Sequence, residues 1–378
     1  RMKMLFDIHC HAMSMARLAI GPFVDAFLRG GLQSFFSQVA APGYILSSVA
    51  RNGGETVRNM LAAVENDPAA LLGLMEDDLA GAFGPPDGGR GSVIGPGGIH
   101  LLGEDWDAWL ACPLGIDFGA VPTGSSVYYG SPPRKSMEES VREALSGISG
   151  YRRERPAGRL AFRPFLGIDP GARGAADTEL ALFRYFNGYS HRLPTQVSAF
   201  KASARWKGDP ARPPRGSFAG IKLYPPLGFD PWPGDRAALD ATRLLYRFCE
   251  TRGIPLVVHC DDQGYRVVPL DKAMRLTDPA RWLDVLGEFP GLIVDFAHFG
   301  ERYLGRPGKR GSWTVTIVEL MRRYPGVYAD VAFNGSEPVY WNKLAGYLDS
   351  LPSIDAGLVR SRLLFGTDFV ISLMKARS

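Results

Sequence analysis

Eight short apolar runs, each bounded by turn residues, constrain the fold of this 378-residue chain more than any other feature. Continuous apolar runs of roughly four to eight residues are typical of strands that are buried on both faces of a sheet. The predicted strands are Met4–His11, Trp109–Phe118, Leu160–Ile168, Ala219–Pro225, Ile254–Cys260, Leu292–His298, Val327–Phe333 and Leu363–Asp368.

Helical patterns separate the later strands. The predicted helices are Arg236–Arg252, Pro279–Glu288, Thr314–Arg323 and Trp341–Leu351, with Ser136–Arg155 earlier in the chain. Alternation of strand and helix favours a parallel α/β sheet, and eight such units favour a closed (β/α)8 barrel of the TIM type. We therefore expect one barrel domain over residues 1–378.

The connection between the first two strands, residues 12–106, is much longer than one helix requires. We interpret it as an insertion with a helix at Thr56–Glu65 and a second at Met75–Phe83. The Gly/Pro-rich stretch Gly84–Gly98 predicts a flexible loop or the edge of a lid. It is not a dinucleotide-binding motif, because no strand leads into it.

Charge and cysteine content exclude several classes of function. The net charge is +4 and the basic residues are scattered, which argues against a nucleic-acid partner. The four cysteines form no CxxC pair, which is typical of a reducing compartment. Since no signal peptide or membrane-length apolar run is found, we expect a cytoplasmic protein that binds a small molecule and no membrane; a homo-oligomer is compatible with this.

The first predicted strand ends in a His-x-His motif. Because side chains alternate along a strand, His9 and His11 share one face with Asp7 below them. Met4, Phe6, Ile8 and Cys10 are expected on the opposite face, against the helices. The two histidines then lie inside the barrel at its carboxyl end, where barrel enzymes keep their active sites, and can converge on one cation.

Polar residues also stand at the ends of four later predicted strands. They are Lys222 on the fourth, His259 on the fifth, His298 on the sixth and Asp368 on the eighth. Each could be a separate buried polar residue. Their joint placement at one end of the barrel instead favours a shared metal site.

These residues occur in motifs that resemble the amidohydrolase superfamily, in its amidohydrolase-related or amidohydrolase-2 branch. The motifs are Asp7-Ile8-His9-Cys10-His11, Gly220-Ile221-Lys222-Leu223-Tyr224-Pro225, Val258-His259-Cys260, Ala297-His298-Phe299-Gly300 and Leu364-Phe365-Gly366-Thr367-Asp368. They follow the family's order along the chain. The resemblance explains neither the insertion at 12–106 nor the substrate.

The resemblance implies a site for one or two divalent ions, with zinc, manganese and iron all compatible with the ligands. The implied ligands are His9, His11, Lys222, His259, His298 and Asp368. Lys222 would bridge two ions after carboxylation, as in binuclear relatives. Alternatively, Lys222 stays an ammonium that binds a substrate oxygen or pairs with Asp7 or Asp117.

The resemblance also implies catalytic roles. Asp368 would take a proton from the attacking water and pass it to the leaving group. His259 and His298 would either bind metal or polarise the scissile carbonyl. Tyr224 and Arg266, near the ends of the fourth and fifth strands, are candidates for substrate binding.

The function we expect is therefore metal-dependent hydrolysis of a C–N or C–O bond in an amide, lactone or ester of a small polar molecule. A first alternative is a non-oxidative metal-dependent decarboxylase of the same superfamily, in which the lysine of the fourth strand is usually absent. A second alternative is a barrel that binds a ligand without catalysis, which the complete set of ligand residues disfavours.

Overall fold

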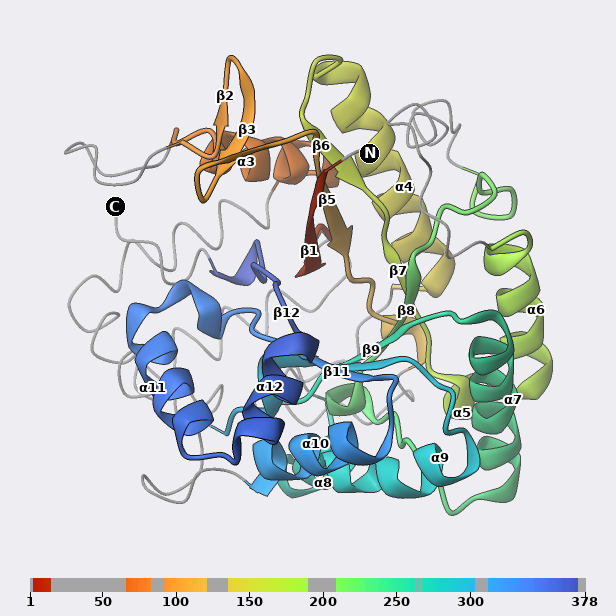
Figure 1. Ribbon diagram of the computed structural model, residues 1–378. Helices are drawn as coiled ribbons and strands as arrows, with labels where there is room; N and C mark the ends of the chain where they lie inside the picture. The colour runs from red at the N-terminus through yellow and green to blue at the C-terminus, as the bar shows by residue number, and fades with distance from the viewer. Residues whose placement is uncertain are drawn as a thin grey trace, which may run out of the picture.

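The strands of this protein are arranged in three sheets. The computed structural model describes residues 3–14, 66–82, 92–120, 135–189, 209–262, 264, 267–302 and 312–372. Within these ranges, one parallel sheet has the order β12-β11-β10-β9-β8-β7, a second parallel sheet has the order β1-β5-β6, and a small antiparallel sheet has the order β2-β3-β4 (Figure 1). The α/β class with parallel strands is therefore confirmed.

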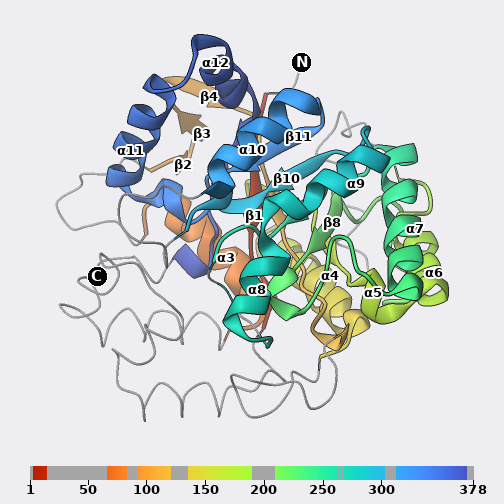
Figure 2. The same ribbon diagram turned by 90° about the horizontal axis from the view of Figure 1, so that it is seen from below.

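The six-stranded sheet carries most of the apolar core. Its strands are β7 (Phe165–Gly167), β8 (Gly220–Leu223), β9 (Leu256–Val258), β10 (Val294–Phe296), β11 (Val327–Asp330) and β12 (Leu363–Leu364). Along one side of this sheet lie α6 (Ala175–Phe186), α7 (Arg236–Arg252), α9 (Trp282–Glu288), α10 (Ser312–Arg323) and α12 (Ser353–Arg362), as Figures 1 and 2 show.

The two faces of this sheet differ in chemistry. Alternate residues of four strands join one apolar cluster with the covering helices: Ile221, Leu223, Leu256, Val258, Val294, Phe296, Val327 and Ala329. Burial of each large aliphatic side chain stabilises the fold by about 1.5–3 kcal/mol. The residues between them point to the inner face, where Lys222, Val257 and Asp295 stand in register on neighbouring strands.

The second parallel sheet contains β1 (Met4–Cys10), β5 (Ala108–Pro113) and β6 (Leu160–Phe162). The predicted strand Leu160–Ile168 is divided, because Pro164 between β6 and β7 has no N–H to donate. On the other side, Ile8 N–H donates to the Phe365 carbonyl at 3.1 Å. The described strands thus form two parallel sheets joined at both sides, and not one continuous ladder of eight.

Strand β1 departs from simple alternation. Its register against β5 shifts between Asp7 and Cys10, so the strand contains a bulge. Met4 packs against an inner cluster that includes Leu110 and Val257, whereas Cys10 packs with a separate cluster on the helix side. The prediction that Met4 shares the face of Cys10 is therefore wrong, because the extra residue of the bulge reverses the alternation.

The described residues of the insertion contain a helix and a small antiparallel sheet. Helix α3 (Pro68–Leu79) begins seven residues before the predicted Met75, because the Asp67 carboxylate accepts from Ala70 N–H and caps the helix. The last part of the predicted loop Gly84–Gly98 belongs to the hairpin of β2 (Ile94–Gly95) and β3 (Gly98–Leu101). The third strand of this sheet is β4 (Glu104–Trp106), and the predicted helix Thr56–Glu65 lies outside the described residues.

The predicted helices between the strands are confirmed with small changes at their ends. Helix α7 has the predicted bounds, because Asp235 caps its start and Gly253 ends it at a φ of 63°. Helix α4 (Met137–Glu154) begins at a capping box formed by Ser136 and Glu139. Helix α11 (Pro338–Asp349) corresponds to the predicted Trp341–Leu351, and two further helices are α5 (Pro170–Arg173) and α8 (Leu270–Thr277).

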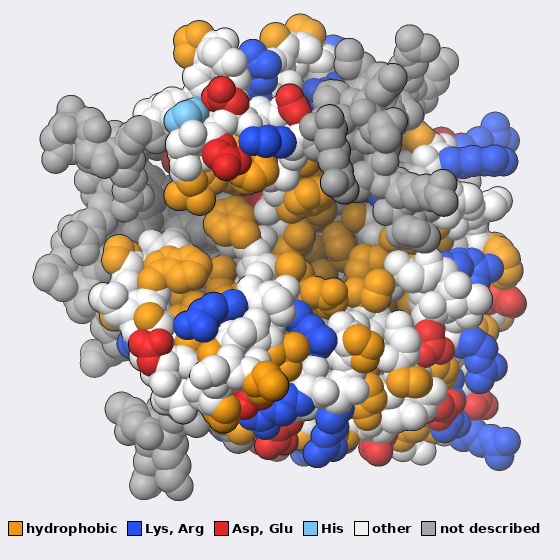
Figure 3. Space-filling view, viewed as in Figure 1, with side chains coloured by type: hydrophobic (Ala, Val, Ile, Leu, Met, Phe, Trp, Pro, Cys, Tyr) orange, Lys and Arg blue, Asp and Glu red, His pale blue; other side chains and the backbone are white. Residues whose placement is uncertain are grey.

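The surface view in Figure 3 shows Lys and Arg side chains interspersed with Asp and Glu on this face. Hydrophobic side chains gather at its hollowed middle, between the β2-β3-β4 sheet and helices α10, α11 and α12 (Figure 3).

All four cysteines are buried and free. Among the described residues, no helix combines the length and apolar character needed to cross a membrane.

Candidate metal centre

The structure brings together the predicted polar residues from the ends of the strands. His9 lies near the end of β1 and His11 just beyond it, while His259 directly follows β9. His298 and Asp368 lie beyond strands that end earlier than predicted, at Phe296 and Leu364. All five of these polar side chains are buried.

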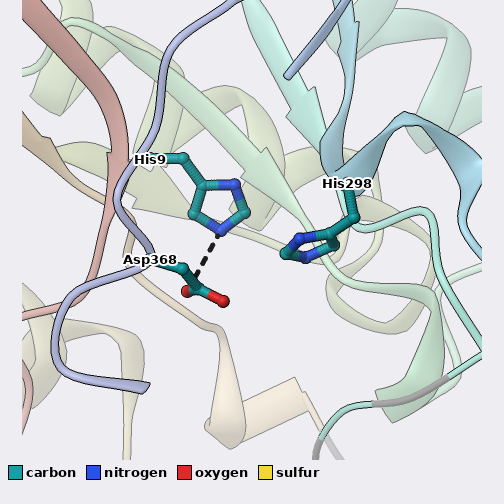
Figure 4. A group of neighbouring side chains, drawn as sticks. All are labelled: His9, His298 and Asp368. Carbon is teal, nitrogen blue, oxygen red and sulfur yellow. Dashed lines mark ion pairs between the residues drawn. The ribbon is translucent and has the colours of Figure 1, made fainter. Parts of the chain in front are cut away.

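His9 of β1 and His11, just beyond this strand, converge on the carboxylate of Asp368. Asp368 Oδ1 lies 3.3 Å from His11 Nε2 and 3.6 Å from His9 Nε2. The ring of His298 lies 4.8 Å from the ring of His9. Figure 4 shows His9, His298 and Asp368 pointing toward one another from three different segments, and single donor atoms of the three lie within 4.8 Å of one another.

Three imidazoles are held at Nδ1 by an acceptor. His9 Nδ1–H donates to Asp330 Oδ2 at 2.8 Å. His11 Nδ1–H donates to the Leu114 carbonyl at 3.2 Å, and His298 Nδ1–H donates to the Ala332 carbonyl at 3.0 Å. Because a carbonyl oxygen can only accept, we assign the proton to Nδ1 in each ring. In His9 and His11 the Nε2 lone pair then faces Asp368, which is the orientation that a metal-binding histidine needs. In His298, whose pKa is raised, Nε2 can also carry a proton.

Asp330, at the end of β11, is an important residue that the sequence analysis did not single out. Besides holding His9, its carboxylate accepts from the backbone N–H of His298 and of Ala332, each at 2.9 Å. One carboxylate therefore fixes a side chain of β1 and the backbone beyond β10. Alternation along β11 was the signal that could have found it, because Asp330 falls on the inner face.

A second cluster adjoins the first. Asp261, which follows His259 by two residues, has Oδ1 at 3.0 Å from His259 Nε2 and Oδ2 at 3.6 Å from His298 Nε2. The rings of His259 and His298 lie 5.2 Å apart. Asp261 is buried beside the two histidines.

Lys222 lies on the inner face of β8 beneath these clusters. Its Nζ is buried and makes no hydrogen bond with the described residues. The expected pairing with Asp7 or Asp117 is absent from this part of the chain: Asp7 accepts from Thr367, and Asp117 pairs with Arg173. Burial lowers the pKa of Lys222 from 10.5 to about 8, against the opposing effect of Asp330, Asp368 and other carboxylates.

The electrostatics of the centre suit neutral imidazole and ionised carboxylate. Burial lowers the pKa of His9 to about 4, so this ring is neutral near pH 7. Burial alone would raise the pKa of Asp368, but His11 and His9 outweigh it and lower that pKa. Burial alone would lower the pKa of His298, but Asp261, Asp368 and Asp330 outweigh it and raise it.

Asp7 and Thr367 hold the segment that carries Asp368. The Thr367 hydroxyl donates to Asp7 Oδ2 at 2.6 Å, and the Thr367 N–H donates to Asp7 Oδ1 at 3.0 Å. The next N–H, that of Asp368, donates to the His9 carbonyl at 2.8 Å. These bonds fix Asp368 at a φ of 53°, a conformation that is uncommon for residues other than glycine and typical of functional sites.

Backbone strain of the same kind recurs at the neighbouring strand ends. His298 has a φ of 61° and Phe333 has a φ of 63°. Each such residue costs about 1–3 kcal/mol unless the surroundings impose the conformation. Here Asp330 accepts from the His298 N–H, which shows one of the bonds that impose it.

The remaining predicted residues have different outcomes. Tyr224 packs in an apolar cluster with Ile116 and Leu227, and its ring lies 4.8 Å from that of His259. Arg266 lies outside the described residues, and its substrate-binding role stays a prediction.

Comparison with known proteins agrees with this geometry. Residues 212–377, which contain β8 to β12, match the model of a family described as amidohydrolase, in its amidohydrolase-2 branch. No curated protein sequence matches the chain.

Solved structures that match include a crystal structure of an amidohydrolase from Mycobacterium avium subsp. paratuberculosis K-10. The sequences are 16% identical, and the alignment covers 71% of this chain and 62% of that chain, with a TM-score of 0.31. This chain therefore spans less than two thirds of the length of that protein, and the likeness carries no weight in the assignment. The family match covers residues 212–377, and it is this part of the chain that is similar to the amidohydrolase-2 branch.

Proposed function

We propose that this protein is a metal-dependent hydrolase and that its two parallel sheets are the two parts of one (β/α)8 barrel. The chain passes directly from β6 to β7, and β1 is hydrogen-bonded to the segment after β12. One inner apolar cluster contains side chains from both sheets, including Leu110 of β5 and Val257 of β9. These features support a single domain over residues 1–378, with residues 12–106 as an insertion.

The observation that carries the proposal is the orientation of the imidazoles. His9, His11 and His298 each have Nδ1 bonded to an acceptor and Nε2 directed to the Asp368 carboxylate or its vicinity. Neutral nitrogen and ionised oxygen donors are what a divalent ion such as zinc binds. The donors present therefore fit a metal, and His9, His11 and Asp368 would hold it.

A divalent ion in this position would act as a Lewis acid, lowering the pKa of water toward neutral and polarising the bond under attack. Asp368 is ionised, since its pKa is lowered, and its carboxylate can accept the proton of the attacking water. The same carboxyl group then returns the proton to the leaving nitrogen or oxygen.

The second pair of histidines can act on the substrate. His298 is buried among carboxylates that raise its pKa, so it can donate a proton or hydrogen bond to the carbonyl oxygen. His259 contacts the Tyr224 ring, which places both on one side of the centre as candidates to orient a substrate. We propose small polar amides, lactones or esters as the substrates, with cleavage of a C–N or C–O bond.

The test combines metal analysis with a substrate screen. Protein purified without chelator is analysed for zinc, manganese and iron, and the loaded protein is offered amides, lactones and esters. We expect bound metal and hydrolysis that falls by about 10²–10⁴-fold in Asp368→Asn, since a positioned acid and base contributes that much.

Three results would decide against parts of this proposal. Absence of metal, even after soaking with zinc or manganese, would overturn the whole of it. Metal binding with release of carbon dioxide from aromatic acids, and no hydrolysis, would make the protein a decarboxylase. Metal binding with neither activity would favour a binding barrel.

A further inference from the structure

Lys135 is a buried lysine outside the candidate metal centre. It directly precedes Ser136, the N-cap of α4, and its side chain is 1% exposed. Its Nζ forms an ion pair with the carboxylate of Glu143, in the second turn of α4. Desolvation offsets much of the attraction within such a pair, so it adds little to stability. Its directional bonds can instead fix one conformation of a neighbouring segment.

The segment that the pair fixes is the one that follows β1. The Lys135 ammonium donates to the Ser14 carbonyl at 2.9 Å. The Glu143 carboxylate accepts from the Ser14 N–H at 3.4 Å and from the Ser14 hydroxyl at 3.3 Å. The ion pair therefore engages the backbone and the side chain of one residue, which lies 121 positions before Lys135 in the sequence.

Ser14 is the third residue after His11, whose Nε2 faces Asp368. At the other end of this short segment, the His11 N–H donates to the Phe369 carbonyl. The chain from His11 to Ser14 is thus tied at one end to the segment that carries Asp368 and at the other end to α4. The backbone of His11 depends on both attachments.

The loop after β5 connects the pair to the partner of the His11 ring. Leu114, at the start of this loop, accepts from His11 Nδ1 at 3.2 Å. Because this distance is at the long end of the range for N–H···O bonds, the direction of the ring depends on the backbone that carries it. Further along the loop, a Cβ on Gly119 would lie 3.2 Å from the Lys135 carbonyl oxygen, so the loop lies directly against the residue that holds Ser14.

We propose that Lys135 and Glu143 are positioning residues for the candidate metal centre. By holding Ser14, they keep the His11 ring directed at Asp368. This inference rests on the proposed function, because His11 would be a ligand of the metal ion there.

The test removes the ion pair in two ways. Lys135→Met leaves the Glu143 carboxylate without its ammonium, and Lys135→Met combined with Glu143→Leu removes both charges. Urea unfolding measures stability, and cobalt titration against a chelator measures metal affinity. NMR of the metal-free protein measures hydrogen exchange of the His11 Nδ1 proton, a readout that needs no metal.

The double variant should unfold at close to the wild-type urea midpoint, because apolar side chains can replace a buried ion pair without loss of stability. Both variants should nevertheless bind cobalt about 10–100-fold more weakly, the loss typical of residues that orient a metal ligand. The His11 Nδ1 proton should exchange faster in both, whereas the Nδ1 proton of His9, held by Asp330, should stay protected. A pair with only a structural role would not give retained stability together with weakened binding.

Arg155, at the opposite end of α4, supplies the matched control. Its guanidinium donates to Asp77 of α3 at 2.7 Å, and so joins the same helix to another segment of the insertion. Arg155→Met combined with Asp77→Leu should leave the cobalt affinity and the exchange of the His11 proton unchanged.

The outcomes separate this inference from the proposed function. Wild-type affinity and wild-type exchange of the His11 proton in both variants of the pair would overturn the inference and leave the proposed function standing. Recovery of both properties in the double variant alone would also overturn it, since the effect would then come from the unpaired Glu143 charge. A His11 Nδ1 proton that is already unprotected in the wild type would overturn it as well. If the wild type binds no metal, the proposed function fails, and the exchange of the His11 proton still decides whether the pair positions this ring. If Lys135→Met does not fold, the double variant makes the same comparison.

Discussion

The two faces of the six-stranded sheet have opposite roles although they are formed by the same strands. On the outer face, Leu256 and Val258 of β9 are packed with Trp282 and other apolar side chains of the helices. On the inner face, Lys222 is buried without a hydrogen-bond partner among the described residues, and burial raises the pKa of the Asp295 carboxyl. The outer face thus stabilises the fold, and the inner face holds charges that burial destabilises.

Because of this difference, one strand carries residues that stabilise the fold on its outer face and residues that form the candidate site on its inner face. A residue of β8 or β10 and its next neighbour face different environments, although both are buried. Substitutions on the outer face should therefore destabilise the fold and leave metal binding intact, whereas removal of a buried charge from the inner face should stabilise the fold. Four predictions test this contrast, from the largest expected effect to the smallest.

Trp282→Ala should lower the free energy of unfolding by about 3–5 kcal/mol, because it removes a buried aromatic ring that contacts Tyr246 and Phe296. Urea unfolding measures the loss. Trp341→Ala is the control, since Trp341 is 44% exposed and its removal should cost about 1 kcal/mol or less. A fall in the number of metal ions per folded chain in Trp282→Ala would contradict the expectation that outer-face substitutions leave metal binding intact.

Lys222→Met should stabilise the metal-free protein by up to about 3 kcal/mol at pH 7. The pKa of Lys222 is lowered to about 8 in the folded state, so its buried charge opposes folding fully below pH 8, and this penalty fades as the pH rises toward 10.5. Urea unfolding at pH 7 and pH 10 gives the two values.

The advantage of Lys222→Met must therefore shrink at the higher pH. The exposed Lys272→Met variant should show no such dependence on pH. An advantage that stays constant or grows with pH would show that the stabilisation does not come from removing a buried charge.

Asp330→Asn should weaken metal binding by about 10–100-fold, because an amide cannot hold His9 Nδ1 and the N–H groups of His298 and Ala332 as one carboxylate does. Chelator competition measures the affinity. Asp355→Asn changes a carboxylate that pairs with Arg322 at the surface helices and should bind metal as the wild type does. Equal affinities in both variants would contradict the role assigned to Asp330.

Thr367→Val has the smallest expected effect, about 1 kcal/mol in unfolding, from the loss of one hydroxyl donor to Asp7. Metal affinity should fall several-fold with it, because Thr367 precedes Asp368. Thr367→Ser keeps the hydroxyl and should restore the affinity even where it does not restore the stability. Failure of serine to do so would assign the effect to packing.

Much of the site could be predicted because polar residues at the ends of apolar strands are recognisable in a sequence. His9, His11, His259, His298 and Asp368 all lie at one centre, although two of the strands end earlier than predicted. Strand β12 ends early because the chain turns toward β1, where Phe365 and Asp368 make backbone hydrogen bonds. Strand β10 ends early because a 3-10 turn begins at Ala297.

Other features depend on pairings between distant segments, which local patterns do not contain. The bulge in β1 arises from its register against β5, so alternation alone misplaced Met4. Asp261 follows the end of β9, and its burial depends on the fold of the segment that contains Gly264. The division of the predicted strand Leu160–Ile168 into β6 and β7, by contrast, could have been predicted from Pro164.

The hydrogen bonds between β1 and the segment after β12 have a consequence for the newborn protein. During synthesis on the ribosome, His9 and His11 emerge before Asp368 and before the Thr367 partner of Asp7, because they precede them in the chain. A nascent chain that stops before Leu363 can already bury much of the helix-covered core, yet it lacks the carboxylate that faces both histidines. Uptake of metal at this centre would therefore mark a chain whose translation has reached residue 368.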